Sequence, residues 1–230
     1  MPLTHTMLAA VLHGKEDLRM ERIPIPRAAP GDVVLRVDAA LTCGTDLKVY
    51  RRGYHAMMLK PPIVFGHELA GTIVEVGHSV DLTRFSLGDR VLPMNSAPCD
   101  ACFFCLRNQQ NLCADLLFNN GAYAEYIRIP ARIVEKNTFS VPTTLPFEHA
   151  ALTEPLACVI HGLDQTNPQP GDTLAVLGAG PIGLMFIHVA SLRGLRVIAL
   201  VKRDDQVAAA RLFGAAEVVQ LSHSQEKTSD

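Results

Sequence analysis

The chain has 230 residues, 48% of them hydrophobic, and its 21 Lys and Arg against 23 Asp and Glu give a net charge of −2. This composition is that of an ordered globular chain of one large or two modest domains, without a basic surface for nucleic acid or a membrane. No apolar run reaches the roughly 18 residues of a membrane-spanning helix, and the N-terminus lacks the basic region of a secretory signal. We therefore expect a cytoplasmic protein whose thiols stay reduced.

The first half of the chain predicts β-structure. Its β-branched and aliphatic residues occur in short runs that Gly and Pro separate. Strands are expected at residues 8–12, 33–37 and 72–76, around Val91, and at residues 123–129. Residues 1–6 precede the first run as an extension. Many short strands with few helical patterns are typical of a barrel or a sandwich.

The pattern changes near Pro146. The residues that follow favour helix on both sides of the Glu154–Pro155 step, because proline is tolerated in a first helical turn. From Gly171 onward, strands and helices are expected in alternation at residues 173–177, 181–192, 196–201, 205–213 and 217–221. This order predicts a βαβαβ unit with a parallel sheet. We divide the chain into domains 1–150 and 151–230, and we expect an irregular polar tail after Leu221.

Four of the six cysteines lie close together, in the pattern Cys99-x2-Cys102-x2-Cys105-x7-Cys113. Four thiolates at such spacing can surround one metal ion, as in the closed tetrahedral sites of structural zinc. An iron–sulfur cluster also uses four thiolates, so the cysteines alone leave the metal open. Four unrelated core cysteines are a poor explanation for this density.

A second group of candidate ligands is dispersed along the chain. Cys43 lies in the segment Cys43-Gly-Thr-Asp46, and a His67-Glu68 pair follows later. Thiolate, imidazole and carboxylate are the mixed ligands of a zinc site that keeps an open position. Each residue alone is a weak signal, since single Cys and His residues are more often packed in a core.

The wider pattern is specific. Gly66-His67-Glu68-x2-Gly71-x5-Gly77-x2-Val80, taken with Cys43 and the four-cysteine segment, resembles the zinc-dependent medium-chain alcohol dehydrogenases from about residue 7 to residue 221. The resemblance implies a GroES-like β-barrel domain followed by an incomplete Rossmann domain. It also implies two zinc ions per chain, one structural on the four cysteines and one catalytic on Cys43 and His67 with Glu68 or Glu154.

The resemblance also assigns roles around the catalytic zinc. Glu154 stands where the classical alcohol branch has a third ligand cysteine, and an acid there resembles the polyol and threonine dehydrogenase branch; the alternative is an acid favoured by a helix N-terminus. Asp46 would orient the ring of His67, and Thr45 would pass the alcohol proton outward. Lys48 stands where relatives often have histidine, so it either continues this relay or contacts ribose or phosphate.

A glycine-rich segment indicates a dinucleotide. Gly178-Ala-Gly180-Pro-Ile-Gly183 follows an apolar strand and opens a helix, the context in which backbone N–H groups hold a pyrophosphate. By resemblance, Val201 occupies the position of the acid that selects NAD, and Lys202 and Arg203 follow it. Two cations without that acid favour the 2′-phosphate of NADP, unless they are solvated loop charges.

The function implied is that of an oxidoreductase: zinc polarises an alcohol or polyol oxygen, and hydride passes to NAD(P)⁺. A zinc-free quinone reductase relative is disfavoured, because it would not need both ligand groups. The alternative is a non-catalytic zinc-binding fragment, because a six-strand dinucleotide domain needs about twice the 60 residues after Gly171. A C-terminally truncated chain would then rely on a second copy or a complementing chain, and the substrate is not readable from the sequence.

Overall fold

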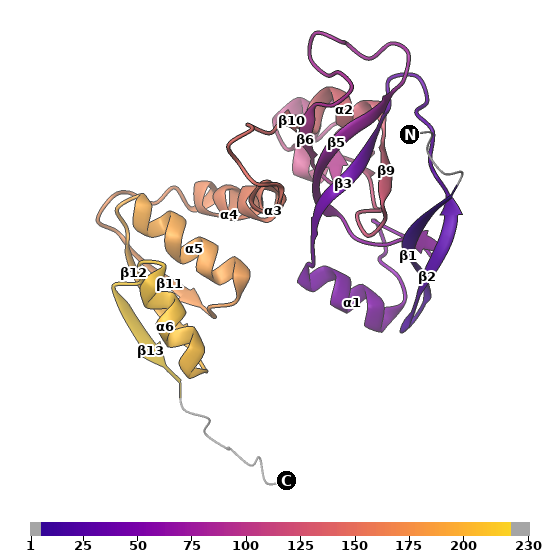
Figure 1. The fold of residues 1–230 in the computed structure, drawn as a ribbon. Coiled ribbons are helices and arrows are strands. Elements are labelled where there is room, and N and C mark those ends of the chain that lie inside the picture. Colours follow the sequence, from indigo (N-terminus) through magenta and orange to yellow (C-terminus); the bar gives the residue numbers. More distant parts are fainter. Residues whose placement is uncertain (1–5, 222–230) are drawn as a thin grey trace. The chain divides into compact units, whose positions relative to one another are not determined.

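A computed structural model describes residues 6–221 and divides them into two compact units between Glu154 and Pro155 (Figure 1). The expected N-terminal extension, but for Thr6, and the polar tail after Leu221 lie outside the described residues. No helix within residues 6–221 is long and apolar enough to cross a bilayer.

The first unit, up to Glu154, is built on antiparallel sheets. A five-stranded sheet has the order β10-β6-β5-β3-β9, a three-stranded sheet has the order β2-β1-β4, and β7 pairs with β8. The strands are β1 Thr6–Gly14, β2 Asp17–Pro24, β3 Val33–Leu41, β4 Ile63–Val64, β5 Glu68–Val76, β6 Arg90–Pro93, β7 Ser96–Ala97, β8 Leu117–Phe118, β9 Tyr126–Ile129 and β10 Thr138–Ser140.

The core of this unit lies against the central strands of the larger sheet. Val33 and Leu35 of β3 are fully buried, and Leu35 pairs across the ladder with Ile73 of β5. Gly71 of β5 lies so close to the neighbouring strand that an added Cβ would stand 2.1 Å from the carbonyl oxygen of Arg36. Tight antiparallel packing therefore explains one glycine of the sequence pattern.

Three features of the first unit differ from the sequence prediction. The strand expected at 123–129 begins only at Tyr126, and Tyr123 turns into the interior instead. The charged strand β2 was not predicted, because its residues are mostly exposed and carry little apolar pattern. Helices were also missed: α1 Gly44–Arg52, the 3-10 turns η1 Cys105–Arg107 and η2 Gln110–Leu112, and α2 Ala131–Asn137.

Two helices begin between Pro146 and Pro155, where the sequence predicted helix. They are α3 Phe147–Ala150 and α4 Thr153–Thr166, with Pro155 in the first turn of α4. A proline is accepted there because its missing N–H has no partner to lose.

The second unit, from Pro155, confirms the predicted parallel repeat. It contains β11 Thr173–Leu177, α5 Pro181–Leu192, β12 Arg196–Val201, α6 Asp204–Leu212 and β13 Glu217–Gln220. The strands are parallel in the order β11-β12-β13. Helices α4, α5 and α6 pack on this sheet. Their buried residues form one apolar core with the strands, among them Val159 of α4, Ile187 of α5 and Ala210 of α6.

Candidate metal centres and dinucleotide loop

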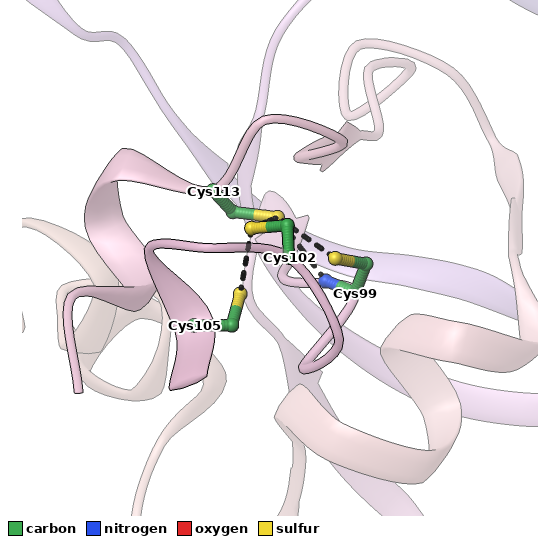
Figure 2. A group of neighbouring side chains, drawn as sticks. All are labelled: Cys99, Cys102, Cys105 and Cys113. Atoms are coloured by element: carbon green, nitrogen blue, oxygen red, sulfur yellow. Dashed lines mark hydrogen bonds between the residues drawn. The ribbon is translucent and has the colours of Figure 1, made fainter. Parts of the chain in front are cut away.

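The four clustered cysteines converge on one point. Figure 2 shows their sulfur atoms facing one another from a loop and the turn η1, a segment we call the cysteine lobe (residues 99–113). The Sγ–Sγ distances are 3.5 Å for Cys102–Cys105 and Cys99–Cys113, and 3.9 Å for Cys102–Cys113. All four thiols are free, and Cys105 and Cys113 are buried.

These distances fit a metal ion rather than disulfides. A disulfide would bring two sulfurs to about 2.05 Å. Four sulfurs around zinc, with Zn–S bonds of about 2.3 Å, lie about 3.8 Å apart at the corners of a tetrahedron. The backbone N–H of Cys99 donates to Cys113 Sγ at 3.2 Å, and the N–H of Ala114 donates to Cys102 Sγ at 3.5 Å. Such donors stabilise thiolate charge.

The four thiols cannot all ionise easily by themselves. Backbone N–H groups from Cys105 and Ala114 lower the pKa of Cys102 to about 6. Burial, together with the neighbouring thiols, raises the pKa of Cys105 to about 12. A cation at the centre would remove this conflict, because it favours the thiolate form of every ligand.

Helix α2 ties both ends of the cysteine lobe to the first unit. Arg132 donates to the carbonyl and the carboxylate of Asp115 at 2.8 and 2.9 Å, just beyond the last cysteine. One turn later, Lys136 pairs with the carboxylate of Asp100 and donates to the carbonyl of Pro98 at 3.3 Å. Two cations at i and i+4 therefore flank the lobe, where four thiolates around one Zn²⁺ would carry a formal charge of −2.

The mixed group, Cys43, His67 and Glu68, forms where α1 and β5 begin. Cys43 is the N-cap of α1: its sulfur accepts from the N–H of Thr45 at 3.4 Å, and its own N–H donates to Asp46 Oδ2 at 2.9 Å. This reciprocal arrangement is a capping box. The three candidate ligand atoms lie within 4.8 Å of one another, with His67 and Glu68 buried.

Asp46 contacts two members of this group, His67 and Cys43. Its Oδ1 stands 3.1 Å from Nδ1 of His67, and its Oδ2 also accepts the hydroxyl proton of Tyr123 at 2.7 Å. A proton held on Nδ1 leaves Nε2 of His67 with a lone pair for a metal. Asp46 is 4% exposed, so these contacts satisfy a carboxylate that has little access to water.

Burial and charge set the protonation of the mixed group. Burial raises the pKa of Cys43 and that of Glu68. Burial by itself would also raise the pKa of Asp46, but the hydrogen bonds from His67, Tyr123 and the Cys43 backbone outweigh burial and lower this pKa. Burial by itself would lower the pKa of His67, but the contact with Asp46 outweighs burial and raises this pKa. The surroundings thus favour the protonated form of Cys43, His67 and Glu68, and a divalent cation would compete with these protons.

The remaining predicted residues of this region lie at different distances from the mixed group. Glu154, half-buried at the start of α4, is not within the group of three, although burial and the nearby charges of His67 and Glu68 affect it, with a net rise in its pKa. Thr45 is half-buried in the first turn of α1, and Lys48 is exposed one turn later.

The dinucleotide loop, residues 178–183, leads from β11 into α5. Gly178 has φ +94°, a conformation that a side chain would disfavour. A Cβ on Gly183 would stand 1.9 Å from the carbonyl oxygen of Gly178, whereas a Cβ on Gly180 would meet nothing within 4 Å. Gly183 therefore permits the tight strand-to-helix turn, and Gly180 leaves open space at the N-terminus of a twelve-residue helix.

The three residues predicted to select the cofactor do not share one environment. Val201, the last residue of β12, is 1% exposed and belongs to the core of the second unit. Arg203 is exposed but forms a two-point ion pair with Asp205, both bonds 3.0 Å long. Lys202 is exposed between them. Of the two exposed cations, Arg203 is the one that the described residues show paired with a carboxylate.

Comparisons with known proteins agree with this geometry. The family model of the alcohol dehydrogenase GroES-like domain matches residues 29–141. A sorbitol dehydrogenase of Bacillus subtilis (strain 168) is 35% identical over 230 residues, which cover 95% of this chain and 64% of the relative. A structure of a zinc-binding dehydrogenase from Sinorhizobium meliloti 1021 bound to NADP has a TM-score of 0.85 and 32% identity, over 94% of this chain and 62% of that chain. Residues 29–141 belong to the alcohol dehydrogenase GroES-like domain family, and the chain as a whole is similar to the medium-chain alcohol dehydrogenases.

A third relative within this family is an L-threonine 3-dehydrogenase of Bacillus licheniformis, 34% identical over 214 residues. That match covers 90% of this chain and 60% of the relative. The chain thus spans between 60% and 64% of the length of these three dehydrogenases.

Sequence reasoning missed three residues around the candidate sites. Arg132 and Lys136 could have been noticed as an i, i+4 pair of cations, but only once a helix had been predicted there. Tyr123 carries no comparable signal, because its partner Asp46 lies 77 residues away in the sequence.

Proposed function

We propose that this chain is part of a zinc-dependent oxidoreductase that transfers hydride between the CH–OH group of an alcohol or polyol and NAD(P). The observation that carries the proposal is the mixed group, whose three different donor atoms lie within 4.8 Å of one another beside Asp46. Sorbitol and threonine, named for two of the relatives, each contain a secondary alcohol, which supports the substrate class.

Cys43, His67 and Glu68 are the residues that would hold the catalytic zinc, with Glu154 as the alternative acid. Zinc bound there supplies Lewis acidity, which makes an alcohol proton easier to remove. Asp46 keeps its negative charge and holds the proton on Nδ1 of His67. Thr45 is the hydroxyl that would take up the substrate proton while it releases its own proton toward solvent. Lys48 is exposed one turn later, and its ammonium group, which only donates, does not accept that proton.

The cysteine lobe would hold a second zinc, with a structural role. Its four thiolates leave no position open for a substrate. The proposal is therefore two zinc ions per chain, each with its own ligand group. The thiols of the cysteine lobe are placed as metal ligands rather than paired in disulfides, and we propose a reducing compartment such as the cytoplasm.

The second unit would bind the cofactor as half of a Rossmann fold. Gly178, Gly180 and Gly183 bring backbone N–H groups of α5 to a pyrophosphate. We propose a modest preference for NADP through Lys202, since Val201 provides no carboxylate and Arg203 is already paired with Asp205. Exchange of Arg203 from Asp205 to a 2′-phosphate would strengthen that preference.

A non-catalytic zinc-binding fragment is the second candidate. It is favoured by exposed apolar side chains in the second unit, where Leu177 is 81% and Leu212 83% exposed. Such side chains suit association with a second copy or with a complementing chain. Hydride transfer requires the reacting atoms to be held within roughly 3–3.5 Å, so we expect little or no turnover by the 230 residues alone.

Both candidates are tested with zinc-loaded protein and a panel of secondary alcohols and polyols, each with NAD⁺ and with NADP⁺. The proposal predicts binding of a dinucleotide and formation of its reduced form, with turnover abolished in Cys43→Ser and increased by a segment corresponding to the rest of the relatives. Dinucleotide binding without turnover under any of these conditions would favour the fragment. Zinc-loaded protein that binds neither dinucleotide would contradict the proposal.

A further inference from the structure

Tyr123 lies in a short segment that runs beside the residues preceding His67. The backbone N–H of Tyr123 donates to the carbonyl of Phe65 at 2.9 Å, and those of Gly121 and Ala122 donate to the carbonyl of Gly66 at 2.9 and 3.1 Å. The carbonyl of Tyr123 accepts from the N–H of Ala10 in β1 at 2.8 Å. The backbone of Tyr123 is thereby fixed on both sides.

The ring of Tyr123 packs tightly on Gly66. A Cβ at Gly66, which has φ +84°, would stand 2.6 Å from Cδ1 of the tyrosine ring. The ring also meets Phe65 edge to face, with centroids 5.9 Å apart and an interplanar angle of 86°. This packing leaves the tyrosine little freedom to rotate, so its hydroxyl is held at one place.

That place is next to Asp46. The hydroxyl lies 2.7 Å from Asp46 Oδ2 and 2.9 Å from the carbonyl oxygen of Leu41. Both neighbours are acceptors that compete for the single phenolic proton, and the shorter distance and the negative charge favour Asp46; the side chain of Thr42 is a further partner of the hydroxyl. Asp46 Oδ2 accepts the N–H of Cys43 as well, while Oδ1 faces Nδ1 of His67. One carboxylate therefore connects Cys43, His67 and Tyr123, which come from three separate segments.

We infer that Tyr123 is a positioning residue for the catalytic metal, acting through Asp46 on the ring of His67 and on the main chain of Cys43. This inference rests on the proposed function, because it assumes that the mixed group binds zinc. The rigid phenol fixes the rotation of the Asp46 carboxylate. The carboxylate in turn fixes two of the three ligands before the metal arrives.

Tyr123→Phe isolates the contribution of the hydroxyl. The phenylalanine ring keeps the packing on Gly66 and Phe65, while Asp46 Oδ2 loses one of its two donors. Partners of metal-ligating histidines typically contribute a factor of about 10–100 to metal affinity. We expect the zinc affinity of the mixed group to fall about tenfold, with the cysteine lobe unchanged.

The experiment measures both zinc affinities by chelator competition in the full chain, for the parent, Tyr123→Phe and Asp46→Asn, and for the double variant. Tyr126→Phe is the matched control, because this tyrosine also lies in the first unit but its hydroxyl has no hydrogen bond to either ligand group among residues 6–221. Cobalt substitution gives a second readout, since the visible bands of Co²⁺ respond to ligand angles. We expect the bands of the mixed group to shift in Tyr123→Phe and not in Tyr126→Phe.

Selective weakening of the mixed group, a cobalt band shift, and a loss in the double variant smaller than the sum of the single losses would support the positioning role. Unchanged affinity and bands in Tyr123→Phe would overturn it, and so would equal weakening of both sites, which would show a role in stability alone. A parent that binds zinc only at the cysteine lobe would overturn the proposed function and this inference together.

Discussion

The two ligand groups of the first unit are assembled in opposite ways. The cysteine lobe takes four identical donors from fifteen consecutive residues, and its sulfurs lie 3.5 to 3.9 Å from one another where hydrogen bonds join them. The mixed group takes its donors from two segments, residues 43 and 67–68, and Asp46, which is not one of the three candidate ligands, contacts Cys43 and His67. A local group can close around an ion by folding a loop, whereas a dispersed group depends on the sheets and helices that carry it.

This difference leads to a division of labour. Removing the ion from the lobe would leave four thiols, two of them buried, facing one another in a loop that α2 anchors at its two ends. Removing it from the mixed group would leave side chains that hydrogen bonds and burial already hold. The lobe should therefore depend on its metal for folding, and the mixed group should depend on the fold for its metal.

The largest effect is expected from Cys102→Ser. Structural zinc binds with apparent free energies of about 10–16 kcal/mol, and even a fraction of this, about 3 kcal/mol, would lower the melting temperature by roughly 10 °C. Calorimetry with metal analysis should show both losses together. Cys158→Ser, at a cysteine outside both groups, serves as the control. A variant that loses zinc and keeps its melting temperature would break the comparison.

Cys43→Ser should separate metal from stability. It removes one ligand of the mixed group but leaves a hydroxyl that can still cap α1, so we expect the loss of one zinc with a change in unfolding free energy below about 1 kcal/mol. Metal analysis and thermal unfolding on the same sample test this. Unfolding of the variant on the scale of Cys102→Ser would show that both groups stabilise the fold.

The zinc affinity of the mixed group should depend on pH. The pKa values of Cys43, Glu68 and His67 are all raised, and each of these groups must lose a proton to bind the ion, so affinity falls as the pH falls. One proton displaced, that of Cys43, corresponds to about a tenfold change per pH unit. The slope steepens at lower pH as His67 and Glu68 take up protons. Asp46, with its lowered pKa, stays charged.

Chelator competition at several pH values, in protein whose cysteine lobe is already loaded, measures this slope. Cys43→Ser provides the background. A zinc affinity independent of pH would mean that zinc does not displace the thiol proton of Cys43.

The smallest effect concerns the cations of α2. Lys136→Met removes the ion pair with Asp100, a partly exposed contact that solvent screens. We expect the zinc affinity of the lobe to fall a few-fold, with the mixed group unaffected. Arg19→Met, which removes an exposed ion pair in β2, is the control. Equal results for the two variants would show that α2 does not tune the lobe.

The sequence predicted those parts of the molecule that have a local cause. The runs at 173–177, 181–192 and 196–201 coincide with β11, α5 and β12, because a buried strand, a glycine turn and an apolar helix each leave a contiguous signature. Helix α1 was missed because its residues are mostly polar and give no apolar periodicity. The capping box of Cys43 and Asp46 was the signal in the sequence that could have predicted its start. Tyr123 could not be found, because its role depends on a contact with Asp46 that only the folded chain creates.

The most direct test of the account is X-ray absorption at the zinc edge of the fully loaded parent, with Cys43→Ser for comparison. The account predicts two ions in the parent, one with four sulfur ligands and one with a single sulfur ligand, about five sulfurs in total. In the variant it predicts about four sulfurs around the one ion that remains. One ion with four sulfurs in both proteins would contradict it, because the mixed group would then hold no metal.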